Sequence, residues 1–329
     1  MGSPLNRRPV LTVLFCMAAT QAIPAQGTWT PTAPLLMGRF LHAVAAGVDG
    51  TIYVLGGRIG IAVIDDAEAY DSGSDSWSNI ASLPTARQGL AATAGPDGRI
   101  YTAGGFSAGP LGVVEAYDPG SDQWFDISPM PTPRHSAAAA TGQDGRVYVI
   151  GGRASDGPLN VVEAYDPTTC TWMTAAPMPT ARFQFAAVTG SDGLIYAIGG
   201  NSVAAALDTV EAYDPSTDRW SARANMPTAR HGLGVANGPN GLIYALGGTV
   251  FGETKVYSLV EAYDPTSDVW TTVAPMLDAR FAFGAAAGGD GRVYAVGGTT
   301  GVRTLTAVEA YDAPPAPEVP FVRRADGRR

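Results

Sequence analysis

A period of about 48 residues runs through almost the whole chain and constrains its fold more than any other feature. Glycine pairs recur at positions 56–57, 104–105, 151–152, 199–200, 247–248 and 297–298. All the tryptophans of the chain keep the same spacing: Trp29, Trp77, Trp124, Trp172, Trp220 and Trp270. A fixed period of this length predicts one supersecondary unit that is repeated along the chain.

Each repeat predicts four antiparallel strands. An Ala/Val-rich run such as residues 42–46 comes first, and its small side chains suit a crowded central position. A turn such as Asp49-Gly50 leads to a second strand of the type I-Y-V-L-G-G, since Asp-Gly accepts the positive φ angles of a tight hairpin. A variable loop follows, and then a third strand carries E-A-Y-D, from residues 68–71 to residues 309–312. A second turn leads to the fourth strand, which contains the tryptophan.

The glycine pair, the tyrosine of E-A-Y-D and the tryptophan at fixed offsets resemble the kelch repeat over residues 29–312. The resemblance implies an all-β fold, a six-bladed kelch β-propeller with four antiparallel strands per blade around a central channel.

The phase of the pattern predicts how the ring closes. Trp29 precedes the first glycine pair, whereas no tryptophan follows the last E-A-Y-D. We therefore expect the N-terminal strand around Trp29 to be the fourth strand of the sixth blade, which leaves no open sheet edge. The propeller is expected over residues 26–313, with blades at about 38–84, 85–131, 132–179, 180–227, 228–277, and 278–313 plus 27–34.

The two ends of the chain differ from the repeats. Arg7 and Arg8 precede an apolar run, Val10 to Ala19, so residues 1–25 are expected to be a signal peptide and the protein to be secreted or periplasmic. Cys170 is then the one cysteine that remains. Residues 314–329, rich in Pro and Arg, are expected to form a disordered tail.

Composition excludes some functions. The formal net charge is −9 and basic residues are not clustered in the repeats, so we expect no nucleic-acid partner. No internal run is long and apolar enough to span a membrane. We expect no cofactor and no metal: His135 and His231 hold equivalent places two blades apart, but no further ligand joins them at a suitable spacing.

One arginine and one glutamate recur in every repeat and allow two interpretations. The arginines are Arg39, Arg87, Arg134, Arg182, Arg230 and Arg280; the glutamates are Glu68, Glu115, Glu163, Glu211, Glu261 and Glu309. The favoured interpretation is a structural ion pair in each blade, because a feature present in all copies usually serves the architecture. The alternative is a ring of free guanidinium groups at the channel entrance that binds an anionic partner.

The loops between second and third strands break the repeat and are the other candidate binding residues. They span residues 58–67, 106–114, 153–162, 201–210, 249–260 and 299–308. The fifth is the longest and is the first candidate. The residues singled out are Arg58, Phe106, Arg153, Phe251, Glu253, Lys255, Tyr257 and Arg303. An aromatic channel mouth that could stack on a sugar is a further hypothesis, from Phe40, Gln88, His135, Phe183, His231 and Phe281, which follow the repeat arginines.

These features favour a binding scaffold for a protein or a carbohydrate over an enzyme. The alternative is a sugar-processing enzyme that resembles the periplasmic sialic acid mutarotase, which would need an acid/base pair at the channel. Galactose oxidase is similar in kelch architecture, but its copper site needs a Tyr–Cys crosslink. Cys170 occupies the place of a turn aspartate, equivalent to Asp75, Asp122, Asp218 and Asp268, and this outer position argues against such an enzyme.

Overall fold

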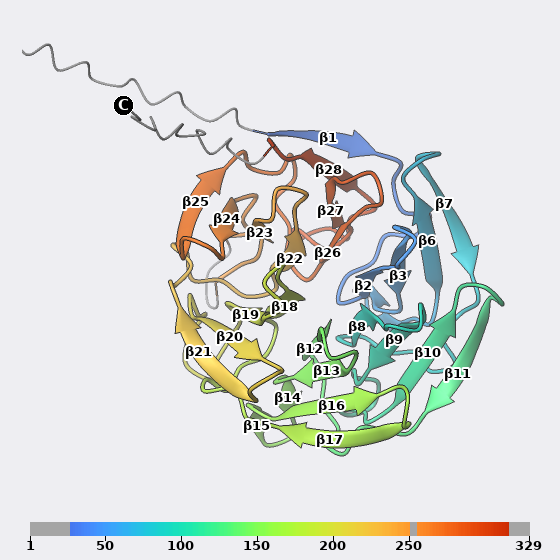
Figure 1. Ribbon diagram of the computed structural model, residues 1–329. Coiled ribbons are helices and arrows are strands. Elements are labelled where there is room, and N and C mark those ends of the chain that lie inside the picture. Colours follow the sequence, from blue (N-terminus) through green and yellow to red (C-terminus); the bar gives the residue numbers. More distant parts are fainter. Residues whose placement is uncertain (1–26, 251–254, 316–329) are drawn as a thin grey trace, which may run out of the picture.

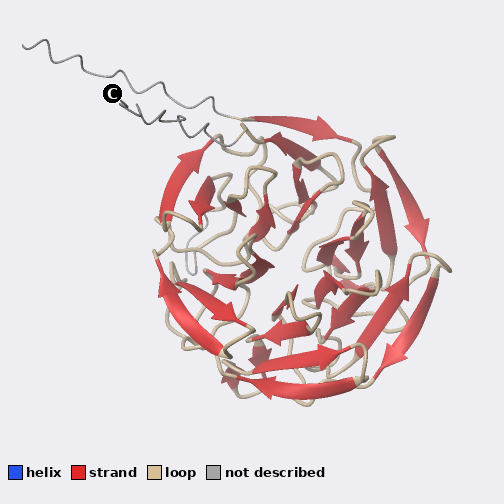
Figure 2. Ribbon diagram, in the orientation of Figure 1, coloured by secondary structure: helices blue, strands red, loops and turns tan. Residues whose placement is uncertain are grey.

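The computed structural model describes residues 27–250 and 255–315, and all of their regular secondary structure is β-strand (Figure 2). The predicted signal peptide, Phe251, Glu253 and the tail from residue 316 lie outside the described residues. In the part of the chain that the structure describes, no helix is long and apolar enough to cross a membrane.

Six antiparallel sheets of four strands surround a central axis, as the repeat predicted (Figure 1). The first three blades, from the axis outward, are β2 (Ala43–Ala46), β3 (Ile52–Leu55), β6 (Ala67–Asp71) and β7 (Ser76–Ile80); β8 (Ala91–Ala94), β9 (Ile100–Ala103), β10 (Val114–Asp118) and β11 (Gln123–Ile127); and β12 (Ala138–Thr141), β13 (Val147–Ile150), β16 (Val162–Asp166) and β17 (Thr171–Ala175).

The remaining blades follow the same order. They are β18 (Ala186–Thr189), β19 (Ile195–Ile198), β20 (Val210–Asp214) and β21 (Arg219–Arg223); β22 (Gly234–Asn237), β23 (Ile243–Leu246), β24 (Val260–Asp264) and β25 (Val269–Val273); and β26 (Gly284–Ala287), β27 (Val293–Val296), β28 (Val308–Asp312) and β1 (Thr28–Thr32). Two short hairpins, β4 (Arg58–Ile59) with β5 (Ala62–Val63) and β14 (Arg153–Ala154) with β15 (Gly157–Pro158), extend the loops of blades 1 and 3.

The glycine pair lets each blade approach the next. Gly56 and Gly57 have φ angles of +60° and +100°, in the left-handed region that favours glycine. The Gly57 N–H donates to the carbonyl of Arg87 in the following blade at 2.9 Å, and a Cβ on Gly56 would lie 2.7 Å from that same oxygen. The repeated pair is therefore required by a close contact between backbones.

Aromatic side chains join the blades on the outer side. Tyr53 of blade 1 packs against Tyr117 of blade 2, and Tyr117 packs against Trp124, with ring centroids 5.8 and 5.3 Å apart. The Trp124 indole N–H donates back to the carbonyl of Ala81 at 2.7 Å. The same tyrosine–tyrosine contact occurs at every joint, so the aromatic hallmarks of the repeat stabilise contacts between blades as well as within them.

The N-terminal strand closes the ring, which confirms the prediction from the phase of the repeat. β1 pairs with β28 in antiparallel register, with Trp29 opposite Tyr311 (Figure 1). The Trp29 indole N–H donates to the carbonyl of Ala274 in blade 5 at 2.9 Å, as the other tryptophans do to their preceding blades.

An aspartate in the turn before each tryptophan ties neighbouring blades together, and two blades lack it. In blade 2, Asp122 accepts the N–H of Ala81 and the hydroxyl of Tyr117, both at 2.8 Å. Asp75, Asp218 and Asp268 make the equivalent bonds. Cys170 takes this position in blade 3 and Gly27 in blade 6, where the hydroxyl of Tyr311 is buried with no partner among the described residues.

Replacing the exposed thiol of Cys170 by a carboxylate is expected to complete the joint between blades 2 and 3. The backbone of Cys170 has φ of 56°, close to the 48–57° of the four aspartates, so Cys170→Asp introduces no new strain. Two added hydrogen bonds are expected to raise the free energy of unfolding by about 1 kcal/mol, or the melting temperature by about 2–4 °C. Calorimetry of Cys170→Asp against Cys170→Ala, which has no acceptor in its side chain, measures this; equal melting temperatures for both variants would contradict it.

Candidate functional site

Each repeat arginine is buried and forms an ion pair with the glutamate of its own blade. The six guanidinium groups have no solvent exposure, and the glutamates are buried with them. The contact is 2.8 Å for Arg87–Glu115 and 2.9 Å for Arg134–Glu163. This is the structural pairing that the sequence favoured.

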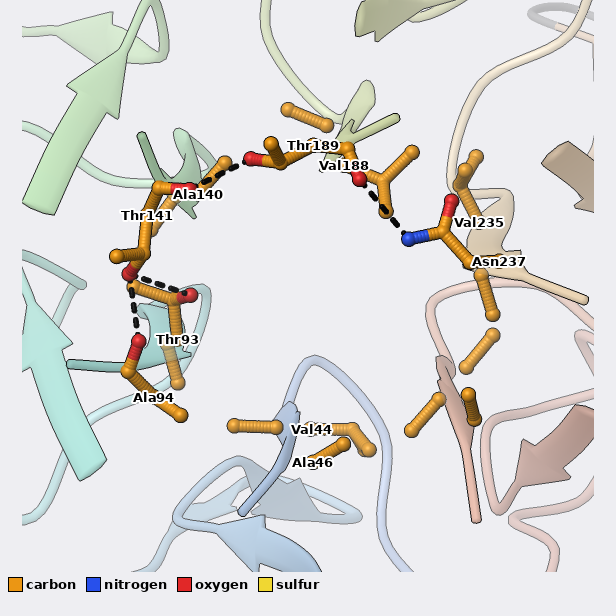
Figure 3. A pocket seen from close by; sticks show the side chains of 18 residues that line it. Val44, Ala46, Thr93, Ala94, Ala140, Thr141, Val188, Thr189, Val235 and Asn237 are labelled. Carbon is orange, nitrogen blue, oxygen red and sulfur yellow. Dashed lines mark hydrogen bonds between the residues drawn. The ribbon is translucent and has the colours of Figure 1, made fainter. Parts of the chain in front are cut away.

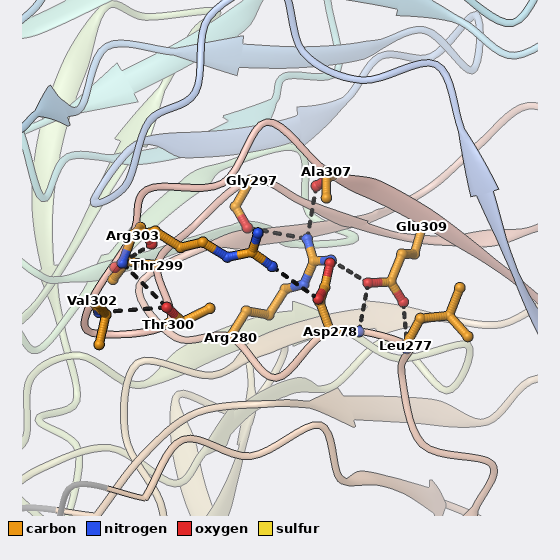
Figure 4. A network of polar contacts seen from close by, with 10 residues as sticks. All are labelled: Leu277, Asp278, Arg280, Gly297, Thr299, Thr300, Val302, Arg303, Ala307 and Glu309. Carbon is orange, nitrogen blue, oxygen red and sulfur yellow. Dashed lines mark hydrogen bonds and ion pairs between the residues drawn. The ribbon is translucent and has the colours of Figure 1, made fainter.

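In four blades the arginine also holds the base of the variable loop, whereas Arg134 and Arg230 donate to a carbonyl of the second strand. Arg182 donates to the carbonyls of Gly199, at the glycine pair, and of Thr209, just before the third strand, at 3.0 and 2.8 Å. Figure 4 shows the same arrangement in blade 6, where Arg280 contacts Gly297, Ala307 and Glu309. One cation thus fixes both ends of a loop and a carboxylate from the third strand.

Each glutamate forms an ion pair with its arginine and accepts a hydrogen bond from a second group. Which group is the second donor depends on the residue three places before the arginine. Four blades have Pro-Thr there, and the threonine hydroxyl donates to the glutamate, as Thr85 does to Glu115 at 2.7 Å. Blades 1 and 6 have Leu36 and Leu277 in place of the proline, and their backbone N–H groups donate at 2.9 and 2.6 Å. Because proline has no N–H, the hydroxyl supplies the missing donor.

This geometry rules out the alternative interpretation, in which Arg39, Arg87, Arg134, Arg182, Arg230 and Arg280 form an anion-binding ring. The guanidinium groups are covered, and their donors point to fixed carbonyl and carboxylate oxygens. Burial lowers the pKa of Arg87 to about 10 and the charge of Glu115 opposes this shift, so the guanidinium stays charged at neutral pH. Removing these six residues from the candidate set leaves the loops and the channel.

The channel is narrow and its lining carries no charge. A cavity of about 260 Å³ lies between the innermost strands, lined by alanine, valine, threonine and one asparagine (Figure 3). Its polar atoms gather on blades 2 to 5: Thr189 donates to the Thr141 carbonyl at 2.7 Å, and the Asn237 amide donates to the Thr189 carbonyl at 2.9 Å. The described lining therefore offers hydrogen bonds but no acid or base.

A closed ring of six backbone hydrogen bonds surrounds the mouth of the channel on the loop side. Each N–H donates to the carbonyl of the equivalent residue in the preceding blade, at 2.6–2.9 Å, and the first blade donates to the last. The members are Leu41, Gly89, Ser136, Gln184, Gly232 and Ala282, all with φ between 51° and 63°. The ring uses the inward N–H groups, so this backbone has none left for an anion.

His42 lies below this ring, at the joint between blades 1 and 6. Its Nε2 is 3.1 Å from the Val296 carbonyl, and its Nδ1 is buried without a partner among the described residues. Leu90 and Leu233 are the equivalents in blades 2 and 5. Burial, and secondarily the charge of Arg39, lower the pKa of His42 from 6.5 to about 3.

The candidate loop residues are accessible and lie on one side of the propeller. We call this side, formed by the second-to-third loops and the connections between blades, the loop face; the turns within blades form the hairpin face. Arg58 and Arg153 stack on Phe40 and Phe183, both at 5.2 Å from the ring centroid. Neither has a carboxylate partner among the described residues.

The other loop candidates occupy separate blades. The ring of Phe106 meets that of His135 edge-on at 5.3 Å, and Lys255 lies over Tyr257 at 4.6 Å in the fifth loop. Arg303 is exposed and reaches Asp278 at 3.4 Å (Figure 4). The candidates thus form local pairs around the rim and do not converge on one centre.

The predicted aromatic channel mouth is not what the structure has. Phe40, Gln88, His135, Phe183, His231 and Phe281 pair through their backbones with the first residue of a second-to-third loop: Arg58, Phe106, Arg153, Asn201, Thr249 and Thr299. The mouth itself is a shallow cavity of about 90 Å³ lined by the residues one or two places further on, including Gln184 and Phe185. Successive side chains of extended backbone point to opposite sides, so the residue in the bridge faces away from the mouth that its successors line.

Three loop tips carry exposed aliphatic side chains that sequence reasoning missed. Ile61, Val203 and Val302 are 93%, 85% and 97% exposed, in blades 1, 4 and 6. Their signal was present in the sequence as apolar residues at the centre of loops. Among the described residues, no group of three or more His, Cys, Asp or Glu is arranged to hold a metal ion.

The loop face and the hairpin face differ in the sign of their charged residues. The described second-to-third loops contain both signs: Arg58, Arg153, Lys255 and Arg303 with Asp65, Asp66, Asp156 and Asp208. The turns of the hairpin face contain mainly aspartates, and many accept hydrogen bonds from their own turn, as Asp71 does from Gly73 at 2.8 Å. The loop face therefore combines balanced charge with apolar tips.

The chain belongs to the kelch-repeat family. The model of the KLHDC2/KLHL20/DRC7 Kelch-repeats domain matches residues 128–298, and the Kelch motif matches residues 39–84 and 89–131. These matches cover the blades whose glycine pairs, ion pairs and aromatic contacts are described above.

Individual relatives are more distant. The Kelch-like protein terF of Aspergillus terreus is 36% identical over 90 residues, which span 25% of this chain and 19% of that protein. The solved structure of YjhT superposes with a TM-score of 0.72 at 16% identity, covering 84% of this chain and 95% of that chain. At this identity the likeness concerns the fold alone.

The buried imidazole of His42 is expected to make the ring sensitive to acid. The pKa of His42 is lower in the folded protein than its value of 6.5 in an unfolded chain, so acid protonates the unfolded chain first. The free energy of unfolding therefore falls as the pH drops from 6.5 toward 3. The loss attributable to His42 is expected to be about 1 kcal/mol per pH unit. Unfolding by urea at pH 7.5 and 4.5 is expected to show a smaller acid loss for His42→Leu than for the wild type. Parallel losses in the two proteins would contradict this, since the carboxylates are common to both.

Proposed function

We propose that this chain is a binding scaffold that holds a protein partner on its loop face. The observation that carries the proposal is the exposure of Ile61, Val203 and Val302 at loop tips of that face. Exposed aliphatic side chains on loops that a rigid ring positions are typical of surfaces that are covered by a partner. Members of this family commonly bind proteins, which supports the same assignment.

The charges of the loop face would orient the partner. Arg58 and Arg153 are held by their aromatic neighbours and lack a carboxylate partner among the described residues. A guanidinium group that is already oriented loses little conformational entropy when it binds a carboxylate. A partner with acidic side chains beside apolar ones would therefore match this half of the rim.

A protein matches the loop face better than a glycan does. Sugar rings bind through open aromatic faces, but here one face of Phe40 and one of Phe183 are covered by guanidinium groups. Phe106 contacts His135 with its ring edge-on. The aliphatic tips have no role in recognising hydroxyl groups.

The alternative of a sugar-processing enzyme has less support. It needs an acid/base pair at the channel, but the repeat glutamates are used in buried ion pairs. The described channel lining is neutral. We therefore propose the scaffold; turnover of a sugar substrate by the purified protein would instead favour the enzyme.

Export of the protein is part of the proposal. Its basis is the positive start at Arg7 and Arg8 and the apolar run that follows. Mass spectrometry of the protein purified from its native host is expected to find a chain that begins shortly after Ala22 or Ala25. Recovery of the intact N-terminus would contradict export by this route.

A variant with Ile61→Asp, Val203→Asp and Val302→Asp is expected to fold normally and lose its partner. All three side chains are exposed, so the melting temperature is expected to stay within a few degrees, whereas three charges on the binding surface are expected to weaken binding at least about tenfold. Affinity capture from host extracts with wild type and variant as paired baits, quantified by mass spectrometry, measures the difference.

Val48→Asp is the matched control for this experiment. Val48 is 75% exposed on the hairpin face, so its substitution adds a charge away from the proposed surface. Proteins recovered with wild type and Val48→Asp but not with the triple variant would support the proposal. Equal recovery with all three baits would overturn it, and glycan-array binding without a protein partner would favour the carbohydrate alternative.

A further inference from the structure

Blade 1 contains a cavity of about 330 Å³ at the outer rim of the loop face. One wall is apolar and comes from Leu36, Met37 and Ile80. Leu36 and Met37 are 56% and 39% exposed, so the cavity opens beside an apolar lip. Polar side chains line the remainder, and they determine which ligand the cavity can hold.

The charge inside this cavity is negative and carried by Asp66. Glu68 also lines the cavity, but its oxygens accept bonds from Arg39 and from the N–H groups of Leu36 and Met37. The carboxylate of Asp66 receives no hydrogen bond from a described residue. Because Arg39 and Glu68 neutralise each other, the half-buried Asp66 leaves one net negative charge in the cavity.

Two neutral polar groups share the cavity with Asp66. Asn79, which lies opposite Glu68 in the sheet register, and Ser82 both line it. Neither side chain is hydrogen-bonded to another described residue. A carboxylate, an amide and a hydroxyl with free capacity are acceptors for a cation with several N–H donors.

The cavity results from departures of blade 1 from the repeat. Asp66 stands where the other blades have Val113, Val161, Thr209, Leu259 and Ala307. Met37 replaces the threonine that donates to the glutamate in four blades, and Ser82 stands where four blades have proline and one asparagine. Blade 1 is thus the one described blade with a carboxylate at the position of Asp66.

We propose that this cavity binds the ammonium group of a lysine side chain from the protein partner, with the lysine stem against Leu36 and Met37. An ammonium group offers three donors on a compact charge, and its stem of methylene groups suits an apolar wall. Lysine is preferred to arginine because a compact ammonium group can contact Asp66, Asn79 and Ser82 together, whereas a planar guanidinium fork pairs with one carboxylate. The inference rests on the proposed function, since it assigns one anchor of that same partner.

Methionine-methyl NMR on the full chain tests the cavity without needing the partner. With ¹³C-methyl methionine, the Met37 signal is assigned by its loss in Met37→Leu and followed during titration with n-butylammonium, the analogue of a lysine stem. We expect a saturable shift of this signal, and little response to n-butanol or n-butyrate. Asp66→Asn is expected to weaken the binding about tenfold, whereas Asp65→Asn, its exposed neighbour outside the cavity, is expected to leave it unchanged.

The titration has outcomes that overturn the inference. No saturable shift, an equal response to butanol, or equal affinity of Asp66→Asn would show that the cavity does not recognise an ammonium group. Binding of n-butylammonium without binding of a capped Ala-Lys-Ala peptide would assign it to small free amines instead of a protein side chain. Because these readouts do not use the loop tips, they are independent of the triple-variant experiment, and either proposal can fail alone.

Discussion

The buried ion pair between one arginine and one glutamate in each blade is the interaction on which the other features depend. In every blade it joins the connection from the preceding blade to the third strand, and in four blades also to the glycine pair, as Arg182 does with Gly199, Thr209 and Glu211. Removing one partner of such a pair leaves an uncompensated buried charge and costs about 3–5 kcal/mol. The buried charge is tolerated because the glutamate oxygens all accept hydrogen bonds. The second donor is a threonine hydroxyl in some blades, such as Thr85, and a leucine N–H in others, such as Leu36.

The blades are alike in their interiors and differ at their joints. The tryptophan and tyrosine contacts occur all round the ring, but the aspartate that ties neighbouring blades is replaced by Cys170 and Gly27. The joint between blades 1 and 6 holds His42 where hydrophobic residues such as Leu90 stand elsewhere. All six blades keep four paired strands despite these substitutions, so the closed ring forms with joints of different composition.

The sequence predicted the features that depend on residue type at fixed spacing. The blade number, the order of strands, the closing strand around Trp29 and the Arg–Glu pairs all follow from such positions, whereas the ring of hydrogen bonds at the channel mouth does not. Its members include Leu41, Ser136 and Gln184, which share a left-handed backbone and no side-chain property. The prediction of an aromatic channel mouth was wrong for a related reason. The ring of backbone hydrogen bonds determines which residue of each connection faces the axis, and the prediction chose a residue one place too early.

The positions that depart from the repeat are those at which the blades of this propeller differ from one another. The buried arginine, glutamate and tyrosine recur in all blades, whereas the loops, joints and rim differ from blade to blade. Blade 1 concentrates these differences: an exposed Ile61 at the loop tip, Arg58 stacked on Phe40, and a cavity with a free carboxylate at Asp66. An apolar tip supplies binding energy, whereas separated charges of opposite sign fix direction, and a partner that engages both must lie along blade 1 in one orientation.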